Sequence, residues 1–290
     1  MKVALVFGLV LVASASAYVE VQKGYHEEIG IPLAKKIKAY EESLPAETRD
    51  ERIVGGAVAA VGAHPYFGGL LINLWNSVGQ SVCGSSLIST NRLVTAAHCW
   101  FDGTNFATQI TVILGSNFLF SGGTRIITRQ VIIHPQYNSA NLNNDVAMIF
   151  LPQSVVTSTL ISPIALPNSW ELWDQFVGQQ AVAAGFGRTS DQQQFASNVV
   201  SDVTLRVISI AQCAPRYIEG TVIQSTLCTD GTGGVGVCSG DSGGPLALQR
   251  GGRPVLIGIS SFVPNIGCQL GFPSGFARVT SFMNFITQYL

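Results

Sequence analysis

The sequence predicts an all-β fold, either a sandwich or a pair of barrels, that ends in one helix. After Ile53 the β-branched residues gather in short runs separated by Gly, Asn and Pro turns, as expected for antiparallel strands. No helical segments alternate with these runs, so a parallel sheet is not expected. The expected strands cover 69–73, 92–96, 109–114, 125–133, 146–150, 180–184, 203–207 and 255–262.

The C-terminus of this region has a helical pattern. Phe282, Phe285, Ile286 and Leu290 fall at i, i+3, i+4 and i+8, which places them on one face of a helix. We therefore expect a helix over 279–290 that packs this apolar stripe on the β-structure.

The charge content and the length of the apolar runs argue against a nucleic-acid-binding protein and against a membrane-spanning one. Of the 290 residues 47% are apolar and 11% are charged, and the net charge is −1. A nearly neutral chain offers no basic surface for phosphates, so a nucleic-acid partner is not expected. After the first 17 residues no stretch approaches the roughly 18 uninterrupted apolar residues of a spanning helix, so no membrane span is expected either.

The N-terminus has the pattern of a secretory signal. Lys2 precedes a short apolar run, and Ala15-Ser16-Ala17 follows as a small-residue cleavage site, which predicts a signal peptide over 1–17. In the oxidising compartment that secretion implies, the six cysteines are expected to form three disulfides, and sequence alone leaves fifteen pairings open. None forms a CxxC pair, so no metal site is expected. The cysteines are Cys83, Cys99, Cys213, Cys228, Cys238 and Cys268.

The composition changes near residue 52. Residues 1–52 hold seven basic and eight acidic side chains, whereas 53–290 hold nine of each and no lysine at all. The change coincides with Arg49-Asp50-Glu51-Arg52, a polar segment of the kind that proteases cut, followed by the apolar Ile53-Val54-Gly55-Gly56. We therefore expect a processing boundary between residues 52 and 53.

One serine stands in a G-x-S-x-G motif, Gly240-Asp241-Ser242-Gly243-Gly244. All four histidines, His26, His64, His98 and His134, precede Ser242, which excludes the residue order of the α/β-hydrolases. No acidic residue lies between Ile53 and His98, which excludes the subtilisin order. Only the order His, Asp, Ser remains feasible for a serine nucleophile.

Three motifs in that order resemble the trypsin/chymotrypsin family of serine endopeptidases over essentially all of 53–290. They are Thr95-Ala96-Ala97-His98-Cys99, Asn144-Asp145-Val146-Ala147 and Gly240-Asp241-Ser242-Gly243-Gly244-Pro245. A narrower similarity to insect (lepidopteran-type) midgut chymotrypsins rests on the shorter string 183–191. The resemblance implies two packed antiparallel β-barrels, over about 53–165 and 166–278, with the C-terminal helix.

The resemblance also implies the roles of the site residues. Ser242 would attack the scissile carbonyl, His98 would take and return its proton, and Asp145 would orient the imidazole. The backbone N–H groups of Gly240 and Ser242 would form the oxyanion hole. The strand edge Ser261, Phe262 and Val263 would pair with the substrate backbone.

The specificity pocket implied by the resemblance is formed by Gly236, Val263 and Ser274. None of the three is charged, so a bound Arg or Lys side chain would lose its hydration without gaining a partner. We expect cleavage after apolar residues. Val263, where the family usually has glycine, is expected to narrow the entrance toward Leu, Met or smaller side chains, while an ordinary chymotrypsin preference for Phe and Tyr stays open.

The family's activation mechanism transfers to this chain as cleavage between Arg52 and Ile53 and pairing of the new α-ammonium with Asp241. An enzyme specific for apolar residues does not cut after arginine, so a trypsin-like protease is expected to activate it. Residues 18–52 would then be an activation peptide, and 53–290 the peptidase domain. The activation peptide has no cysteine and is expected to dissociate once cut. The disulfides implied by the resemblance are Cys83–Cys99, Cys213–Cys228 and Cys238–Cys268.

The remaining predictions concern partners and other polar residues. We expect protein and peptide substrates, protein protease inhibitors, a monomeric state and no cofactor. A calcium site is not favoured, because the loop 115–123 has no carboxylate. His64 and His134 are expected in loops. Most of the other acids after His98 are expected to be solvated surface or turn residues; these acids are Asp102, Glu171, Asp174, Asp191, Asp202, Glu219 and Asp230.

Several alternatives stay open at this stage. A non-catalytic homologue would act as a binding or regulatory protein. Elastase-like or collagenase-like enzymes, and venom or immune proteases, would share the mechanism. The lack of lysine after residue 52 suits a protease that works beside trypsin in the gut lumen, because each lysine would offer a cleavage site.

Overall fold

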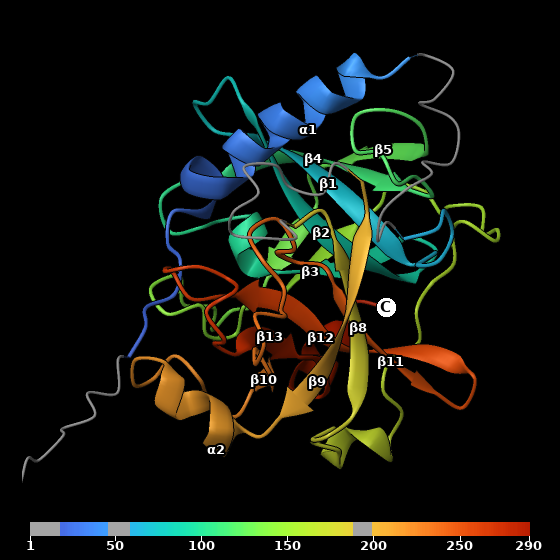
Figure 1. The fold of residues 1–290 in the computed structure, drawn as a ribbon. Helices are drawn as coiled ribbons and strands as arrows, with labels where there is room; N and C mark the ends of the chain where they lie inside the picture. The colour runs from blue at the N-terminus through green and yellow to red at the C-terminus, as the bar shows by residue number, and fades with distance from the viewer. Residues whose placement is uncertain (1–17, 46–58, 188–198) are drawn as a thin grey trace, which may run out of the picture.

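A computed structural model describes residues 18–45, 59–187 and 199–290 of the chain and shows two antiparallel β-units packed on one another (Figure 1). The first unit is a seven-stranded sheet in the order β5-β4-β1-β2-β3-β7-β6, a half-barrel that its hydrogen bonds do not close. Its strands are β1 (Phe67–Leu74), β2 (Gln80–Ser89), β3 (Arg92–Thr95), β4 (Ala107–Leu114), β5 (Thr124–Thr128), β6 (Val131–Ile133) and β7 (Ala147–Phe150).

The second unit is a closed six-stranded barrel in the order β10-β13-β12-β11-β8-β9. Together the two units give the all-β architecture that the sequence and the resemblance predict. Closure pairs every strand of the barrel on both edges, so the barrel has no exposed strand edge. The strands are β8 (Gln180–Gly185), β9 (Ser201–Ile208), β10 (Thr226–Thr229), β11 (Pro245–Arg250), β12 (Arg253–Phe262) and β13 (Ser274–Arg278).

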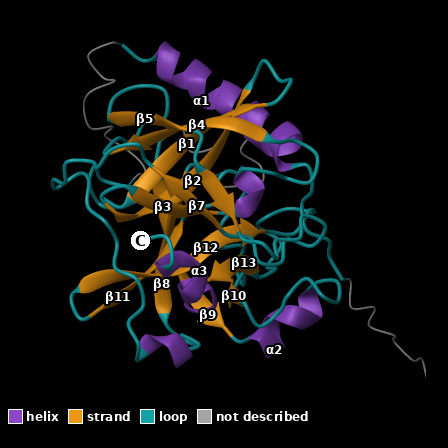
Figure 2. Cartoon of the chain, turned by 180° about the vertical axis from the view of Figure 1, so that it is seen from behind, coloured by secondary structure: helices purple, strands orange, loops and turns teal. Residues whose placement is uncertain are grey.

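The C-terminal helix is a short 3-10 turn, η6 (Val279–Phe282), that continues into α3 (Met283–Thr287). Phe282, Phe285 and Ile286 are buried as predicted, whereas Leu290 is 56% exposed because the helix ends before it. The buried residues join a core that also contains side chains of β7, β11 and β12. Seen from behind, α3 lies where the two units meet (Figure 2). The helix therefore fastens one unit to the other.

Eight predicted runs are strands, but the sequence analysis missed four strands. The run 125–133 forms two strands, β5 and β6, which are separated at Arg129 and Gln130. The missed strands β2, β10, β11 and β13 contain only two Val or Ile residues, both in β2, and so lack the β-branched runs on which the prediction rests. In β2, Gly84 N donates a 2.7 Å hydrogen bond to Ser242 O. This segment forms a strand because of its close tertiary packing rather than because of its local β-propensity.

The N-terminal segment 18–45 packs on both β-units. It consists of an extended stretch, a π-helical turn η1 (His26–Gly30) and α1 (Ile31–Ser43). Figure 1 shows it in blue, rising from beside the second unit to α1 above the first. Among the described residues no helix is long and apolar enough to cross a membrane. The short helical turns elsewhere are η3 (Ala97–Cys99), η4 (Glu171–Trp173), α2 (Ile210–Cys213) and η5 (Ala214–Arg216).

Candidate active site

His98 and Asp145 form a buried pair between the two β-units. His98 lies in η3, directly after β3, and its Nδ1 is 2.7 Å from Asp145 Oδ2. The backbone N–H of His98 donates a second hydrogen bond, 2.9 Å long, to Asp145 Oδ1. The hydroxyl of Ser261 donates to Asp145 Oδ2 at 2.6 Å. Three donors thus fix the carboxylate, and the carboxylate fixes the imidazole with Nδ1 turned toward it.

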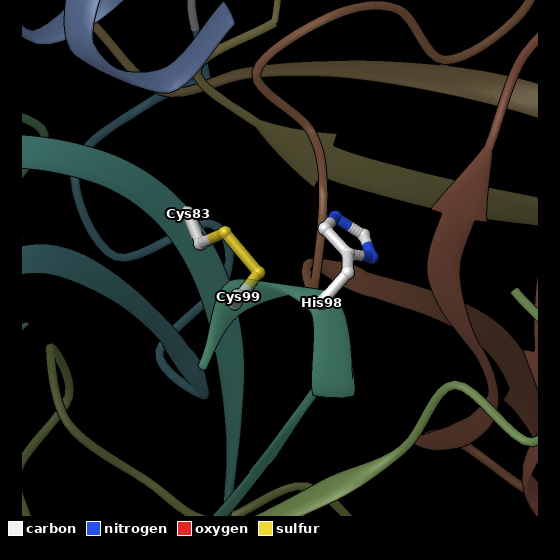
Figure 3. A group of neighbouring side chains, drawn as sticks. All are labelled: Cys83, His98 and Cys99. Atoms are coloured by element: carbon white, nitrogen blue, oxygen red, sulfur yellow. A yellow bond between two sulfur atoms is a disulfide. The ribbon is translucent and has the colours of Figure 1, made fainter. Parts of the chain in front are cut away.

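A disulfide holds the backbone beside His98 (Figure 3). Cys83 and Cys99 are bonded to each other, and their ligand atoms and those of His98 lie within 4.8 Å of one another. Because the two sulfurs are bonded to each other and His98 Nδ1 faces Asp145, this group does not offer a set of thiolate and imidazole ligands. The disulfide instead connects η3 to β2.

Ser242 and Gly240 lie on a tight turn that precedes β11. Gly240 has φ +109°, a conformation that side chains rarely allow. Gly243 N donates to Ser260 O at 2.8 Å, which ties the turn to β12. Ser242 and His98 line one cleft, together with the end of β12 (260–262) and Val263, which follows it. The structure thus brings His98, Asp145, Ser242 and Gly240 together at the boundary of the two units.

The predicted pocket residues come from three separate segments. A Cβ on Gly236 would lie 2.8 Å from Ser274 Oγ, so these two residues are neighbours, and Val263 lines the cleft next to Phe262. The disulfide Cys238–Cys268 ties the segment of Gly236 to the loop before β13. A third disulfide, Cys213–Cys228, joins α2 to β10. The three pairs are those that the resemblance implies.

Asp241 is buried beside the turn and faces away from the cleft, toward β8. Its carboxylate accepts hydrogen bonds from Gly187 N at 2.8 Å and Cys238 N at 2.9 Å, and a Cβ on Gly187 would overlap it. Burial raises the pKa of Asp241 to about 6, although the two backbone N–H groups lower it. The carboxylate borders a cavity of about 410 Å³ that Gly185 and Gly236 also line. Arg52 and Ile53 lie outside the described residues.

Two acidic residues expected on the surface are buried instead. Asp102 is 7% exposed and accepts hydrogen bonds from the backbone N–H groups of His26, Thr104 and Asn105. Glu171 is 5% exposed, because the chain folds it against Asn168 and Arg250. These two residues depart from the expected surface position because a carboxylate can be buried when donors surround it, and most of those donors come from the fold.

The other two histidines of the β-domain serve packing and a surface contact. His64 Nε2 lies 2.7 Å from Asp202 Oδ2. His134 packs edge-on against Phe282 and Phe285 of the C-terminal helix. Neither histidine lines the cleft of Ser242.

The sequence analysis missed the contribution of the N-terminal segment to the cleft. Gln22, Lys23, Gly24, Tyr25 and Ile29 line it together with His98 and Ser242. A four-residue periodicity in the segment could have indicated that one of its faces is buried. Every fourth residue of the segment is buried, at positions 25, 29, 33, 37 and 41, which is the spacing of one helical face.

Comparisons with known proteins agree with this arrangement. A family model described as Trypsin matches residues 53–286. The collagenase of Hypoderma lineatum is 37% identical over 245 residues, which are 83% of this chain and 88% of the collagenase. Brachyurin of Leptuca pugilator is 36% identical over 237 residues, which are 81% of this chain and 96% of brachyurin.

Solved structures give the same assignment. The structure of HL collagenase is 36% identical, has a TM-score of 0.73, and covers 82% of this chain and 98% of its own. The likeness therefore extends over both β-units rather than over a single motif. This chain belongs to the trypsin family of serine endopeptidases.

Proposed function

We propose that the chain is the secreted proenzyme of an endopeptidase that hydrolyses peptide bonds after apolar residues. The observation that carries this proposal is the buried pair of His98 and Asp145, 2.7 Å apart, in one cleft with Ser242. The secretion signal, residues 1–17, lies outside the described residues and rests on the sequence.

In the proposed mechanism Ser242 is the nucleophile. A neutral hydroxyl is a weak nucleophile, so His98 Nε2 takes its proton during attack and later gives a proton to the leaving amine. The Asp145 carboxylate accepts a hydrogen bond from the Nδ1–H of His98. This holds the imidazole in the tautomer with a free Nε2 and stabilises the imidazolium that forms. The backbone N–H groups of Gly240 and Ser242 stabilise the oxyanion, and each such donor lowers the barrier by about 3 kcal/mol.

The proposed preference for apolar residues rests on the pocket composition. Gly236 and Ser274 are neighbours and carry no charge, and the third pocket residue, Val263, is apolar. A substrate cation placed among them would lose its hydration without an ionic partner. We propose that Leu, Met and smaller side chains compete with Phe and Tyr, because Val263 takes space at the entrance.

The proposed activation step is cleavage after Arg52 by a trypsin-like protease. Asp241 supports it, because the carboxylate is buried and its described partners are two backbone N–H groups rather than a cation. The α-ammonium of Ile53 would give this carboxylate a charged partner, which would order the turn of Gly240 and Ser242. An uncut Arg52→Gln variant that still hydrolyses peptides would contradict this step.

We propose a digestive role in a gut lumen, of the insect midgut type. The support is the absence of lysine from 53–290, since lysines would be cut by the trypsin that activates the enzyme. A second candidate substrate is collagen, because one relative is called a collagenase. Collagen chains contain small residues and apolar residues, and the proposed pocket accepts side chains of both kinds.

The test uses the full chain after treatment with trypsin. A fluorophosphonate probe is expected to label Ser242, and the Ser242→Ala variant is expected to stay unlabelled. Peptides that differ only at the residue before the cut are expected to be hydrolysed after Leu, Met, Phe or Tyr. Preferred cleavage after Arg would overturn the pocket assignment, and the absence of both labelling and hydrolysis would favour a non-catalytic homologue.

A further inference from the structure

The N-terminal segment 18–45 crosses the cleft that contains the proposed catalytic residues. Gln22, Lys23, Gly24, Tyr25 and Ile29 line this cleft on one side, and His98 and Ser242 line it on the other. The space left between them is about 30 Å³, enough for a water molecule or two but not for an amino-acid side chain. A substrate peptide therefore cannot enter while the segment is in place.

The ring of Tyr25 packs against the imidazole of His98. The two rings meet edge-on with their centroids 4.9 Å apart, and the Tyr25 hydroxyl donates a 2.9 Å hydrogen bond to Val82 O. His98 is only 2% exposed. Its Nε2, the atom that exchanges protons in the proposed mechanism, has no hydrogen-bond partner among the described residues. Tyr25 thus excludes water and substrate from this nitrogen.

The part of the segment before Tyr25 is anchored on the second β-unit. Val19 and Val21 are each 5% exposed and form bridges with Tyr217 and Pro264. Asn265 N donates a 3.0 Å hydrogen bond to Glu20 O. These contacts lie directly after the strand edge 261–263, where we expect substrate backbone to pair. The segment therefore occupies the space through which a substrate would reach that strand edge.

The part after Tyr25 is anchored on the first β-unit and on the turn of Ser242. Leu33, Ala34 and Ile37 of α1 are buried in a cluster with side chains of β1, β2 and β4. Leu33 Cδ2 lies 2.5 Å from the place that a Cβ would take on Gly240. Leu33 thus rests on the glycine whose N–H is expected to stabilise the oxyanion.

Two polar contacts fix the segment in one register. His26 is fully buried, its backbone N–H donates to Asp102 Oδ2 at 3.0 Å, and its Nδ1 lies 2.8 Å from Ser81 Oγ. Farther along, the Glu41 carboxylate accepts hydrogen bonds from Leu119 N at 2.7 Å and Phe120 N at 3.0 Å. Charge-assisted bonds of this kind are stronger than neutral ones and demand exact placement of the donors.

We propose that residues 18–45 are an inhibitor of the active site, which stays bound after cleavage at Arg52 and keeps the ordered enzyme blocked until it is removed. This inference rests on the proposed endopeptidase function. This inhibition differs from the inactivity of the uncut chain. The bound segment excludes substrate by occupying the cleft, whereas the uncut chain is proposed to be inactive because its oxyanion hole is disordered. The lack of a cysteine in the segment favours its loss, but anchors on both sides of Tyr25 favour retention.

The positions of the lysines indicate how a protease can remove this inhibitor. All five lie in residues 1–52, and the four in the described segment, Lys23, Lys35, Lys36 and Lys38, are exposed. Exposed sites in a helix are open to proteases when the helix frays. The domain 53–290 offers no lysine. A lysine-directed protease therefore destroys the inhibitor and spares the enzyme.

The test treats the full chain with an arginine-specific protease, a lysine-specific protease, or both. After the arginine cut alone, the segment is expected to co-elute with 53–290 in gel filtration, with peptidase activity suppressed at least about tenfold. Diluting this complex from about 10 μM to about 10 nM is expected to raise its specific activity, because dissociation follows mass action. The lysine cut alone is expected to give no activity, and both cuts full activity.

Two variants supply the controls. Tyr25→Ala is expected to be fully active after the arginine cut alone, whereas Tyr18→Ala, which changes a tyrosine of the same segment that is 65% exposed, is expected to stay suppressed. Glu41→Gln weakens an anchor far from the cleft and is expected to raise the concentration at which suppression is lost on dilution. This variant keeps the test valid if Tyr25→Ala does not fold.

The outcomes separate this inference from the proposed function. Full and concentration-independent activity after the arginine cut alone, with the segment eluting separately, would overturn the inhibitor and leave the endopeptidase intact. A doubly cut chain that neither hydrolyses peptides nor reacts with a fluorophosphonate would overturn both.

Discussion

The hydroxyl of Ser261 donates a 2.6 Å hydrogen bond to Asp145 Oδ2, the same oxygen that lies 2.7 Å from His98 Nδ1. Ser261 belongs to β12 of the second unit, whereas Asp145 directly precedes β7 of the first. The position of the carboxylate is therefore set by both units at once. A shift of one unit against the other would move the imidazole.

The first prediction concerns Asp145. Asp145→Asn is expected to lower kcat of the activated enzyme by about 10⁴, because an amide at this place favours the wrong imidazole tautomer. Ser261→Ala keeps the carboxylate and its two contacts with His98, so its loss is expected to be far smaller. Steady-state kinetics on a peptide substrate measures both. Equal losses in the two variants would contradict the assigned role of Asp145.

The second prediction compares two disulfides with loops of similar length. Cys83–Cys99 and Cys213–Cys228 span 16 and 15 residues, so replacing either pair with serines is expected to lower the free energy of unfolding by about 3 kcal/mol. Only Cys83–Cys99 adjoins His98. Its loss is expected to lower kcat/KM as well, while Cys213–Cys228 serves as the matched control. Equal kinetic effects would show that the first disulfide does not position His98.

The third prediction is the pH dependence of the uncut chain. Burial raises the pKa of Asp241 from 3.8 to about 6, so the folded state binds this proton more tightly than the unfolded state does. Stability is then lost as pH rises through this interval, by about 3 kcal/mol in total. Asp241→Asn is expected to remove that loss. Urea unfolding of both proteins between about pH 4 and pH 8 gives the difference, and identical pH profiles would contradict it.

The fourth prediction concerns retention of the cut segment. Burial lowers the pKa of His26 from 6.5 to about 4, Asp102 raises it and His98 lowers it further. The free segment therefore binds a proton that the docked segment does not, and docking weakens as pH falls from about 6.5 to about 4. We expect the dissociation constant of the arginine-cut complex to be about 30-fold larger at pH 5 than at pH 8.

His26→Gln provides the comparison for this pH effect. It removes the titrating group, so the dissociation constant of the complex is expected to vary much less over the same range. Gel filtration and dilution of the arginine-cut complex at each pH measure it. A wild-type constant that does not change between pH 5 and pH 8 would show that His26 does not titrate on release.

Much of the site could be predicted from the sequence because its chemistry is carried by local motifs. The order of His98, Asp145 and Ser242, with no acidic residue between Ile53 and His98, leaves one triad order feasible, and the glycines around Ser242 indicate a turn. The strands rich in Val and Ile were predicted because their pattern is local. The strand β2, built from Ser and Gly, was not, because its place depends on packing against the turn of Ser242.

The sequence by itself determined the residue types of the site, the change in composition near Arg52 and the absence of lysine after it. The tertiary structure decided where residues 18–45 lie. Apart from Glu41, the charged residues of that segment are exposed, while Tyr25, Ile29, Leu33, Ile37 and Glu41 form its buried face. Burial of Asp102 and the covering of His98 by Tyr25 depend on donors and rings that come from distant parts of the chain. Only the fold brings such groups within contact distance.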